Sequence, residues 1–189
     1  MKTTHIVKTL PLVALLALTS CAHKISASEF ANEAKKVSVS SAYKTAKADL
    51  IFDSLDSSGK IVKKSLKQNY SYTSSSPHWK VSGNTVFPTE HLYTINFDIS
   101  FYNNFVSTVK NGLSNTWFEY FASSSELEIR IEGELSSNKL KTHADFHVVW
   151  NYDGLVTRVY EKDVVTVTNS SNSTSKYDLM MRLNITYYK

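Results

Sequence analysis

Alternation of apolar and polar residues with a period of two is the feature that most constrains this chain. From 127 to 134 apolar side chains alternate with charged ones, and the same period returns at 143–150 and 177–187. Because successive side chains of a β-strand point to opposite faces, each run predicts a strand with one apolar and one polar face. The chain therefore has to build a large sheet whose apolar face must be covered.

Turn-forming residues separate these runs from further expected strands. Asp56-Ser57-Ser58-Gly59 reads as a turn. Asp153-Gly154 predicts a two-residue type I′ hairpin, because Asp and Gly tolerate positive φ. A bulge is expected at 161–163. Together with the three runs above, the expected strands are 46–53, 60–73, 79–81, 93–101, 117–122 and 156–168.

One helix is expected before the sheet, opening at Ala27 or Ser28. Phe30 and Ala34 lie on one stripe at helical spacing, and Glu29 favours the positive end of the helix dipole. Residues 103–114 suit only one short helical turn. The fold class is therefore α+β, mainly β: a large, twisted, antiparallel meander sheet, closed as a half-barrel or sandwich, with one N-terminal helix.

The first 20 residues have the layout of a secretory signal. Lys2 and Lys8 precede nine residues, 10–18, that are all apolar or Pro, about half of what a membrane-spanning helix needs. Leu18-Thr19-Ser20-Cys21 resembles a bacterial lipobox, which implies cleavage before Cys21 and diacylglycerol on its sulfur.

The lipobox resemblance sets the expected domains and location. Cys21 is the only cysteine, so it has no partner for a disulfide; the alternative is an ordinary secreted protein. We expect a signal peptide at 1–20, a lipidated tether at 21–27 and one mainly-β domain at 28–189. Lipid on Cys21 would hold the protein on the extracytoplasmic face of the cell membrane, or on the outer membrane if the cell has two.

Charge argues against a nucleic-acid partner. Removing Lys2 and Lys8 lowers the formal net charge from +4 to +2. Nucleic-acid-binding domains gather many more cationic side chains on one face. The expected partners are the membrane and either an apolar ligand or a protein of the envelope.

Three polar residues on one strand face are the best candidates for a metal site. His143, Asp145 and His147 are spaced at i, i+2 and i+4, a spacing at which imidazoles can share one ion. Their alternation with apolar residues favours solvated polar positions instead. Carboxylates at 128, 132 and 134 have equally ordinary solvent-face spacing, and no nucleophile or nucleotide motif is present. We therefore predict no catalytic residue, no cofactor and no enzyme.

The aromatic residues suggest a second kind of site. A curved sheet could wrap an acyl chain with aromatic side chains as the lining of an apolar hollow. The alternative is that these rings fill an ordinary core. The predicted lining is Phe97, Phe101, Trp117, Phe121, Phe146 and Trp150.

The layout of the mature chain adds a resemblance. The lipobox, the early helix with Phe30-Ala31 and the hairpin at 151–154 resemble small surface lipoproteins of low-GC Gram-positive bacteria and their wall-less relatives. Helix-plus-sheet half-barrels that carry lipids across the envelope are similar in outline, which implies lipid handling. The expected function is non-enzymatic binding, with a cell-surface interaction module or a metal-assisted hydrolase as alternatives.

Overall fold

Nine antiparallel strands form one sheet in the computed structural model, which describes residues 22–56, 58–75, 78–82, 98–168 and 170–189. The strand order is β1-β5-β6-β7-β8-β9-β2-β3-β4. The elements are β1 (His23–Ile25), α2 (Ala27–Lys36), β2 (Thr45–Leu55), β3 (Ile61–Tyr72), β4 (Trp79–Ser82), the 3₁₀ helix η2 (Ile99–Phe101), α3 (Tyr102–Gly112), β5 (Ser114–Ala122), β6 (Glu126–Ser136), β7 (Leu140–Asn151), β8 (Val156–Thr168) and β9 (Thr174–Tyr188).

Two meanders make up this sheet. Strands β5 to β9 follow one another through hairpins, and β2 to β4 form a second meander. The two are joined by antiparallel pairing of β2 with β9, in which Leu50 lies opposite Leu183. The predicted mainly-β antiparallel sheet is confirmed.

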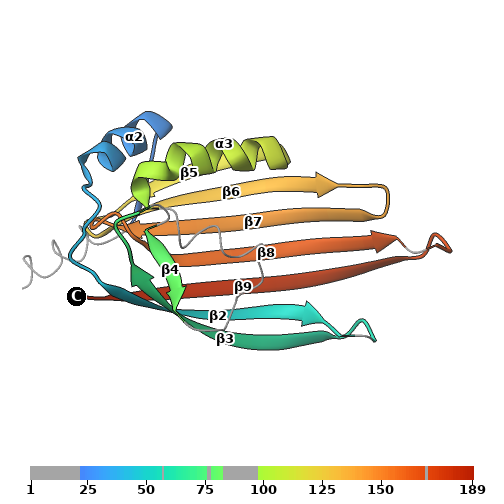
Figure 1. Ribbon diagram of the computed structural model, residues 1–189. Helices are drawn as coiled ribbons and strands as arrows, with labels where there is room; N and C mark the ends of the chain where they lie inside the picture. The colour runs from blue at the N-terminus through green and yellow to red at the C-terminus, as the bar shows by residue number, and fades with distance from the viewer. Residues whose placement is uncertain (1–21, 57, 76–77, 83–97, 169) are drawn as a thin grey trace, which may run out of the picture.

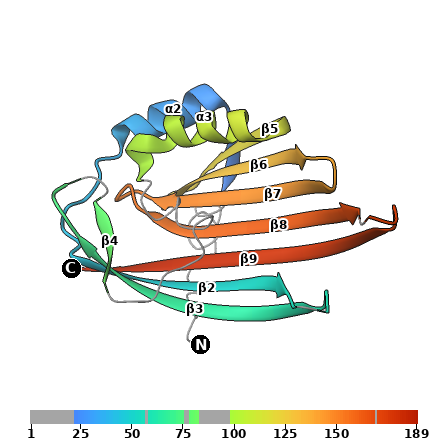
Figure 2. The ribbon, with the colours of Figure 1, turned by 45° about the vertical axis from the view of Figure 1, so that its right-hand side comes forward.

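Helices α2 and α3 lie on one face of the sheet, over β5, β6 and β7 (Figures 1 and 2). Helix α2 begins where the Ser26 side chain accepts from the Glu29 backbone N–H, while the Glu29 carboxylate accepts from Ser26 N–H. Fully buried Phe30 then packs edge-on against Trp150, with ring centroids 6.3 Å apart. From α3, Phe105 lies 5.9 Å from Phe146. The two helices therefore cover the apolar residues of this part of the sheet.

We call the helix-covered side of the sheet the inner face and the opposite side the outer face. On β6, Leu127, Ile129 and Ile131 point to the inner face and are at most 1% exposed. Their neighbours Glu128 and Arg130 point to the outer face. The predicted division into one apolar and one polar face is confirmed for this strand.

Helix α3 is longer than the sequence suggested. Residues 103–114 were expected to hold one helical turn, whereas α3 runs for 11 residues. Tyr102 and Phe105 are buried and Val109 packs partly against the core, so one continuous stripe faces the sheet. Burial of that stripe stabilises a helix that local propensity alone does not predict.

Residues 99–101 contradict the strand predicted for 93–101. They form a 3₁₀ turn because the Asp98 carboxylate accepts from the backbone N–H of Ser100 and turns the chain. Residues 93–97 lie outside the described residues.

The hairpin at Asp153-Gly154 has a different turn from the predicted one. Within the described turn 151–155, Gly154 alone has a positive φ, of 75°, so Asp153 does not adopt the type I′ geometry. The backbone carbonyl of Asn151 accepts a hydrogen bond from Gly154 N–H at 2.9 Å, and the side-chain Oδ1 of Asn151 accepts one from Leu155 N–H at 3.0 Å. A four-residue loop held by Asn151 results.

Two smaller predictions also need correction. The β7–β8 register shifts between Val149 and Trp150, so the irregularity lies beside the turn and not at 161–163. The expected tether at 21–27 contains strand β1, whose His23 pairs with Ala122 of β5, followed by the cap of α2. Backbone pairing orders these residues despite their lack of any clear strand pattern.

Candidate functional site

A row of polar side chains crosses the outer face at the middle of the sheet. Glu119 of β5 lies opposite Arg130 of β6, and Arg130 lies opposite His147 of β7. The row continues through Tyr160 of β8 to Arg182 of β9. Side chains opposite one another on the same face of neighbouring strands interact directly. The sheet therefore holds these five residues side by side.

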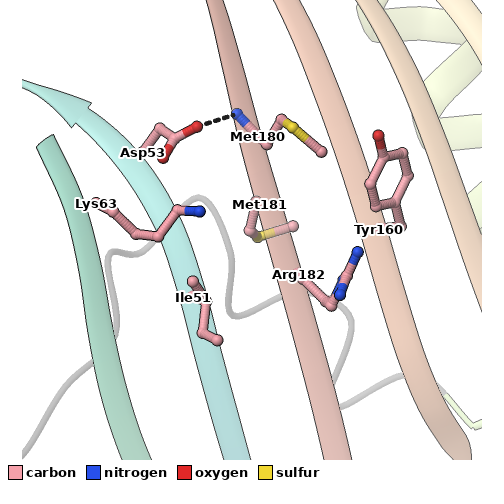
Figure 3. A pocket seen from close by; sticks show the side chains of 7 residues that line it. All are labelled: Ile51, Asp53, Lys63, Tyr160, Met180, Met181 and Arg182. Carbon is pink, nitrogen blue, oxygen red and sulfur yellow. Dashed lines mark hydrogen bonds between the residues drawn. The ribbon is translucent and has the colours of Figure 1, made fainter. Parts of the chain in front are cut away.

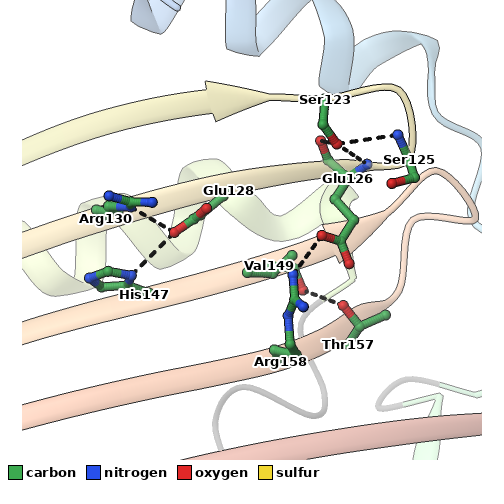
Figure 4. Close-up of polar contacts among 9 residues, drawn as sticks. All are labelled: Ser123, Ser125, Glu126, Glu128, Arg130, His147, Val149, Thr157 and Arg158. Carbon is green, nitrogen blue, oxygen red and sulfur yellow. Dashed lines mark hydrogen bonds and ion pairs between the residues drawn. The ribbon is translucent and has the colours of Figure 1, made fainter. Parts of the chain in front are cut away.

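His147 lies between two carboxylates in this row. Its Nδ1 is 3.2 Å from Oε1 of Glu128, and its Nε2 is 3.0 Å from Oδ1 of Asp145. The same Glu128 oxygen accepts a hydrogen bond from Nε of Arg130 at 2.7 Å (Figure 4). The ring of Tyr160 packs edge-on against the imidazole, with centroids 5.4 Å apart. Both ring nitrogens of His147 therefore have an anionic neighbour.

These contacts change the titration of the two central groups. Burial alone would raise the pKa of Glu128, but hydrogen bonds from His147 and Arg130 outweigh it and lower the pKa to about 2. The hydrogen bond to Glu128 raises the pKa of His147 above its ordinary value, although burial opposes the shift. The cluster thus favours a charged imidazolium, which is a poor general base. It is suited to holding fixed charges on the surface.

A hollow of about 210 Å³ opens beside this cluster. Trp117 lies at the side of this hollow and is 61% exposed, which is unusual for an indole ring. Three carboxylates, one guanidinium group and the His147 imidazole complete it. The lining residues are Trp117, Glu119, Arg130, Glu132, Asp145 and His147. An exposed aromatic ring next to several carboxylates suits a cationic or hydroxyl-rich group.

Two further hollows, of about 190 Å³ each, continue along the same row. The middle hollow shares His147 with the first, and its other residues include Arg158, whose guanidinium donates to Glu126 at 2.6 Å (Figure 4). The third shares Tyr160 and Arg182 with the middle one. We call the three adjoining hollows the outer groove.

The predicted metal residues do not converge. His143, Asp145 and His147 all lie on the outer face of β7, but His143 is exposed and pairs across the sheet with Glu134 and Val164. His147 uses its two nitrogens on carboxylates, as described above. Among residues 22–56, 58–75, 78–82, 98–168 and 170–189, no three His, Cys, Asp or Glu side chains form a group that could hold a metal ion.

The predicted apolar hollow is divided between the two faces. Phe146 and Trp150 lie on the inner face, where rings from both helices pack against them. Trp117 and Phe121 lie on the outer face, opposite Glu132 and Glu128. These two rings cannot line a common hollow with Phe146 and Trp150, and this part of the prediction was wrong.

The other two predicted lining residues add little. Phe97 lies outside the described residues, and Phe101 ends the 3₁₀ helix η2.

The sequence of β5 did indicate that Trp117 and Phe121 lie on a polar face, because Glu119 shares their strand face. That single charged residue marks the face as the polar one.

Comparison of the chain with family models, with curated proteins and with solved structures gave no match. Neither helix in the described part of the chain is long and apolar enough to cross a membrane.

Proposed function

We propose that this chain is an exported lipoprotein, held on the extracytoplasmic face of a membrane by lipid on Cys21, whose body is a non-enzymatic binding module. The lipobox resemblance at Leu18 to Cys21 supports the anchor. The outer groove is the single observation that supports a binding role.

The start of the fold is consistent with anchoring close to the bilayer. Strand β1 begins at His23, two residues after Cys21, and pairs with β5 at one edge of the sheet. Two extended residues span about 7 Å. A lipidated Cys21 would therefore keep this sheet edge within a short distance of the lipid headgroups.

The outer face suits binding better than the inner face does. The inner-face rings Phe146 and Trp150 are packed by Phe105 and Phe30. In the described part of the chain no helix lies over the outer groove, which combines fixed charges with the exposed ring of Trp117. We therefore favour a polar or charged ligand over the apolar one expected from the sequence.

The anchor can be tested by labelling cells with palmitate. The parent chain should incorporate the label and fractionate with membranes, and a Cys21→Ser chain should do neither. Membrane association of Cys21→Ser equal to that of the parent would refute the anchor.

The binding role can be tested with a photo-crosslinking amino acid at residue 117 in intact cells. A matched control carries it at Leu135, which is 48% exposed and belongs to the inner-face register of β6. A discrete adduct at 117 that is lost on Glu132→Lys substitution is expected. Equal adducts at both positions, or none at 117, would contradict the proposed use of the outer face.

A further inference from the structure

The third hollow of the outer groove lies where strands β2 and β9 separate (Figure 3). The last paired residues of the two strands are Phe52 and Met181. At the next position the backbone N–H of Met180 donates to the Asp53 carboxylate, at 3.1 Å, in place of a β2 carbonyl. The hollow therefore lies where the pairing of β2 with β9 ends, and the register of these two strands fixes its position.

Cationic groups dominate this hollow. Lys63 of β3 and Arg182 of β9 both line it, and the only carboxylate among its lining residues is that of Asp53. Among the described residues neither Lys63 nor Arg182 takes part in an ion pair, whereas Lys67 on the same strand lies 3.6 Å from Asp49. The formal charge of the hollow is thus +1, carried by two cations without a partner of their own.

The remaining wall is apolar. Ile51 and Met180 are large apolar side chains, yet they are 42% and 43% exposed there. Tyr160 closes the side towards the middle hollow. A ligand that fits these surfaces has an anionic group for Lys63 and Arg182 and a short apolar portion for Ile51 and Met180.

The size of the hollow limits the ligand. Its volume of about 190 Å³ is below the roughly 300–1,000 Å³ of pockets for drug-sized ligands. We propose that this hollow binds a headgroup-sized organic phosphate, with the phosphate between Lys63 and Arg182 and its first carbon atoms on Ile51 and Met180. The proposal deepens the proposed binding function but requires no lipid on Cys21.

Butyl phosphate is a suitable probe, with inorganic phosphate for comparison, and binding is followed by calorimetry with the unlipidated Cys21→Ser chain. Each buried methylene should raise the affinity about fourfold, so burial of two or more methylenes should make butyl phosphate bind at least tenfold more tightly than inorganic phosphate. Arg182→Gln and Lys63→Gln should each weaken binding by fivefold or more. Lys67→Gln is the matched control, because this lysine is already paired, and should change the affinity less than twofold.

The three substituted residues are exposed, so their variants should unfold at the parent's temperature. Equal weakening by all three substitutions would mean diffuse attraction of anions and would overturn the proposal. So would equal affinity for butyl and inorganic phosphate, or no binding at about 10 mM.

Vesicles distinguish the source of the phosphate. If the unlipidated chain binds phosphatidylglycerol vesicles and butyl phosphate displaces it, the ligand is a lipid headgroup. If it binds butyl phosphate but not the vesicles, the ligand is a free organic phosphate. Either result supports the hollow as the site. Vesicle binding that butyl phosphate leaves unchanged would overturn it. If the hollow does not bind organic phosphate, the outcomes of the crosslinking test at residue 117 and of the palmitate test of Cys21 are unaffected.

Discussion

The inner and outer faces are built by alternate residues of the same strands, yet they differ in what their side chains contact. On the inner face, Trp150 is fully buried between rings from α2 and α3. On the outer face, Trp117 is 61% exposed beside carboxylates. Residue type alone therefore does not determine the role of a side chain: the indole of Trp150 stabilises the fold, and that of Trp117 is available for a ligand.

The largest expected difference comes from truncating these two indoles. Trp150→Ala should lower the free energy of unfolding by about 3–5 kcal/mol, because it opens a cavity in the core. Trp117→Ala should change it by less than about 0.5 kcal/mol, as for most surface substitutions. Urea unfolding of the Cys21→Ser chain measures both values. A similar loss for both would break the distinction between the faces.

The charged cluster of the outer face should make a smaller contribution that depends on pH. Glu128→Gln should cost about 1–3 kcal/mol at pH 6, since it weakens hydrogen bonds from His147 and Arg130. Glu134→Gln is a matched control, because the Glu134 carboxylate lies 4.0 Å from the exposed Lys141 and accepts its only close side-chain hydrogen bond among the described residues from the exposed Asn115, which a glutamine oxygen can also accept.

The sign of the pH dependence follows from the two pKa shifts. The folded-state pKa of Glu128 is lowered to about 2, so its contribution is present above pH 4.5 and is lost as the pH falls towards 2. The folded-state pKa of His147 is raised, so its contribution is present below pH 6.5 and is lost as the pH rises through the folded value. Glu128→Gln should flatten both limbs of the stability profile; an unchanged profile would exclude this coupling.

A carboxylate on the inner face should behave in the opposite way. Burial raises the pKa of Asp163, and its Oδ1 is buried without a hydrogen-bond partner among the described residues. The raised pKa means that stability is lost as the pH rises through the folded value. Asp163→Asn should therefore raise the free energy of unfolding by about 1 kcal/mol at pH 7 and by less at pH 3. Asp145→Asn, on the outer face, should give no gain.

The smallest effect is expected for a hydroxyl group in the core. Tyr70 is 2% exposed on the inner face of β3, and its Oη has no hydrogen-bond partner among the described residues. Tyr70→Phe should be neutral or stabilising by up to about 1 kcal/mol, since it removes an unpaired buried group without leaving a large cavity. A loss above 1 kcal/mol would show that the hydroxyl is satisfied in solution.

Local pattern predicted much of this fold. Alternation identified β6 and β9, because one face of each is buried and the other is not. Pairing of β2 with β9 joins residues 129 to 143 positions apart, and no local signal specifies such a partner. Helix α3 was underestimated because its stability comes from packing of Phe105 on Phe146.

The candidate site was less predictable than the fold. His147 and Asp145 were identified from their spacing along β7, but Glu128 reaches His147 only through the β6–β7 register. The third hollow was not foreseen, because it depends on the point where β2 and β9 separate. Such sites arise from alignment between strands, which the sequence of each strand does not contain.

The division of labour between the two faces can be measured by mapping backbone amide NMR shifts of the Cys21→Ser chain during titration with butyl phosphate. We expect saturable shifts confined to the outer groove, centred on Met180 and Arg182, with inner-face residues such as Phe146 and Trp150 unchanged. Shifts centred on the inner face, or none on the outer groove, would contradict the assignment of packing to one face and binding to the other.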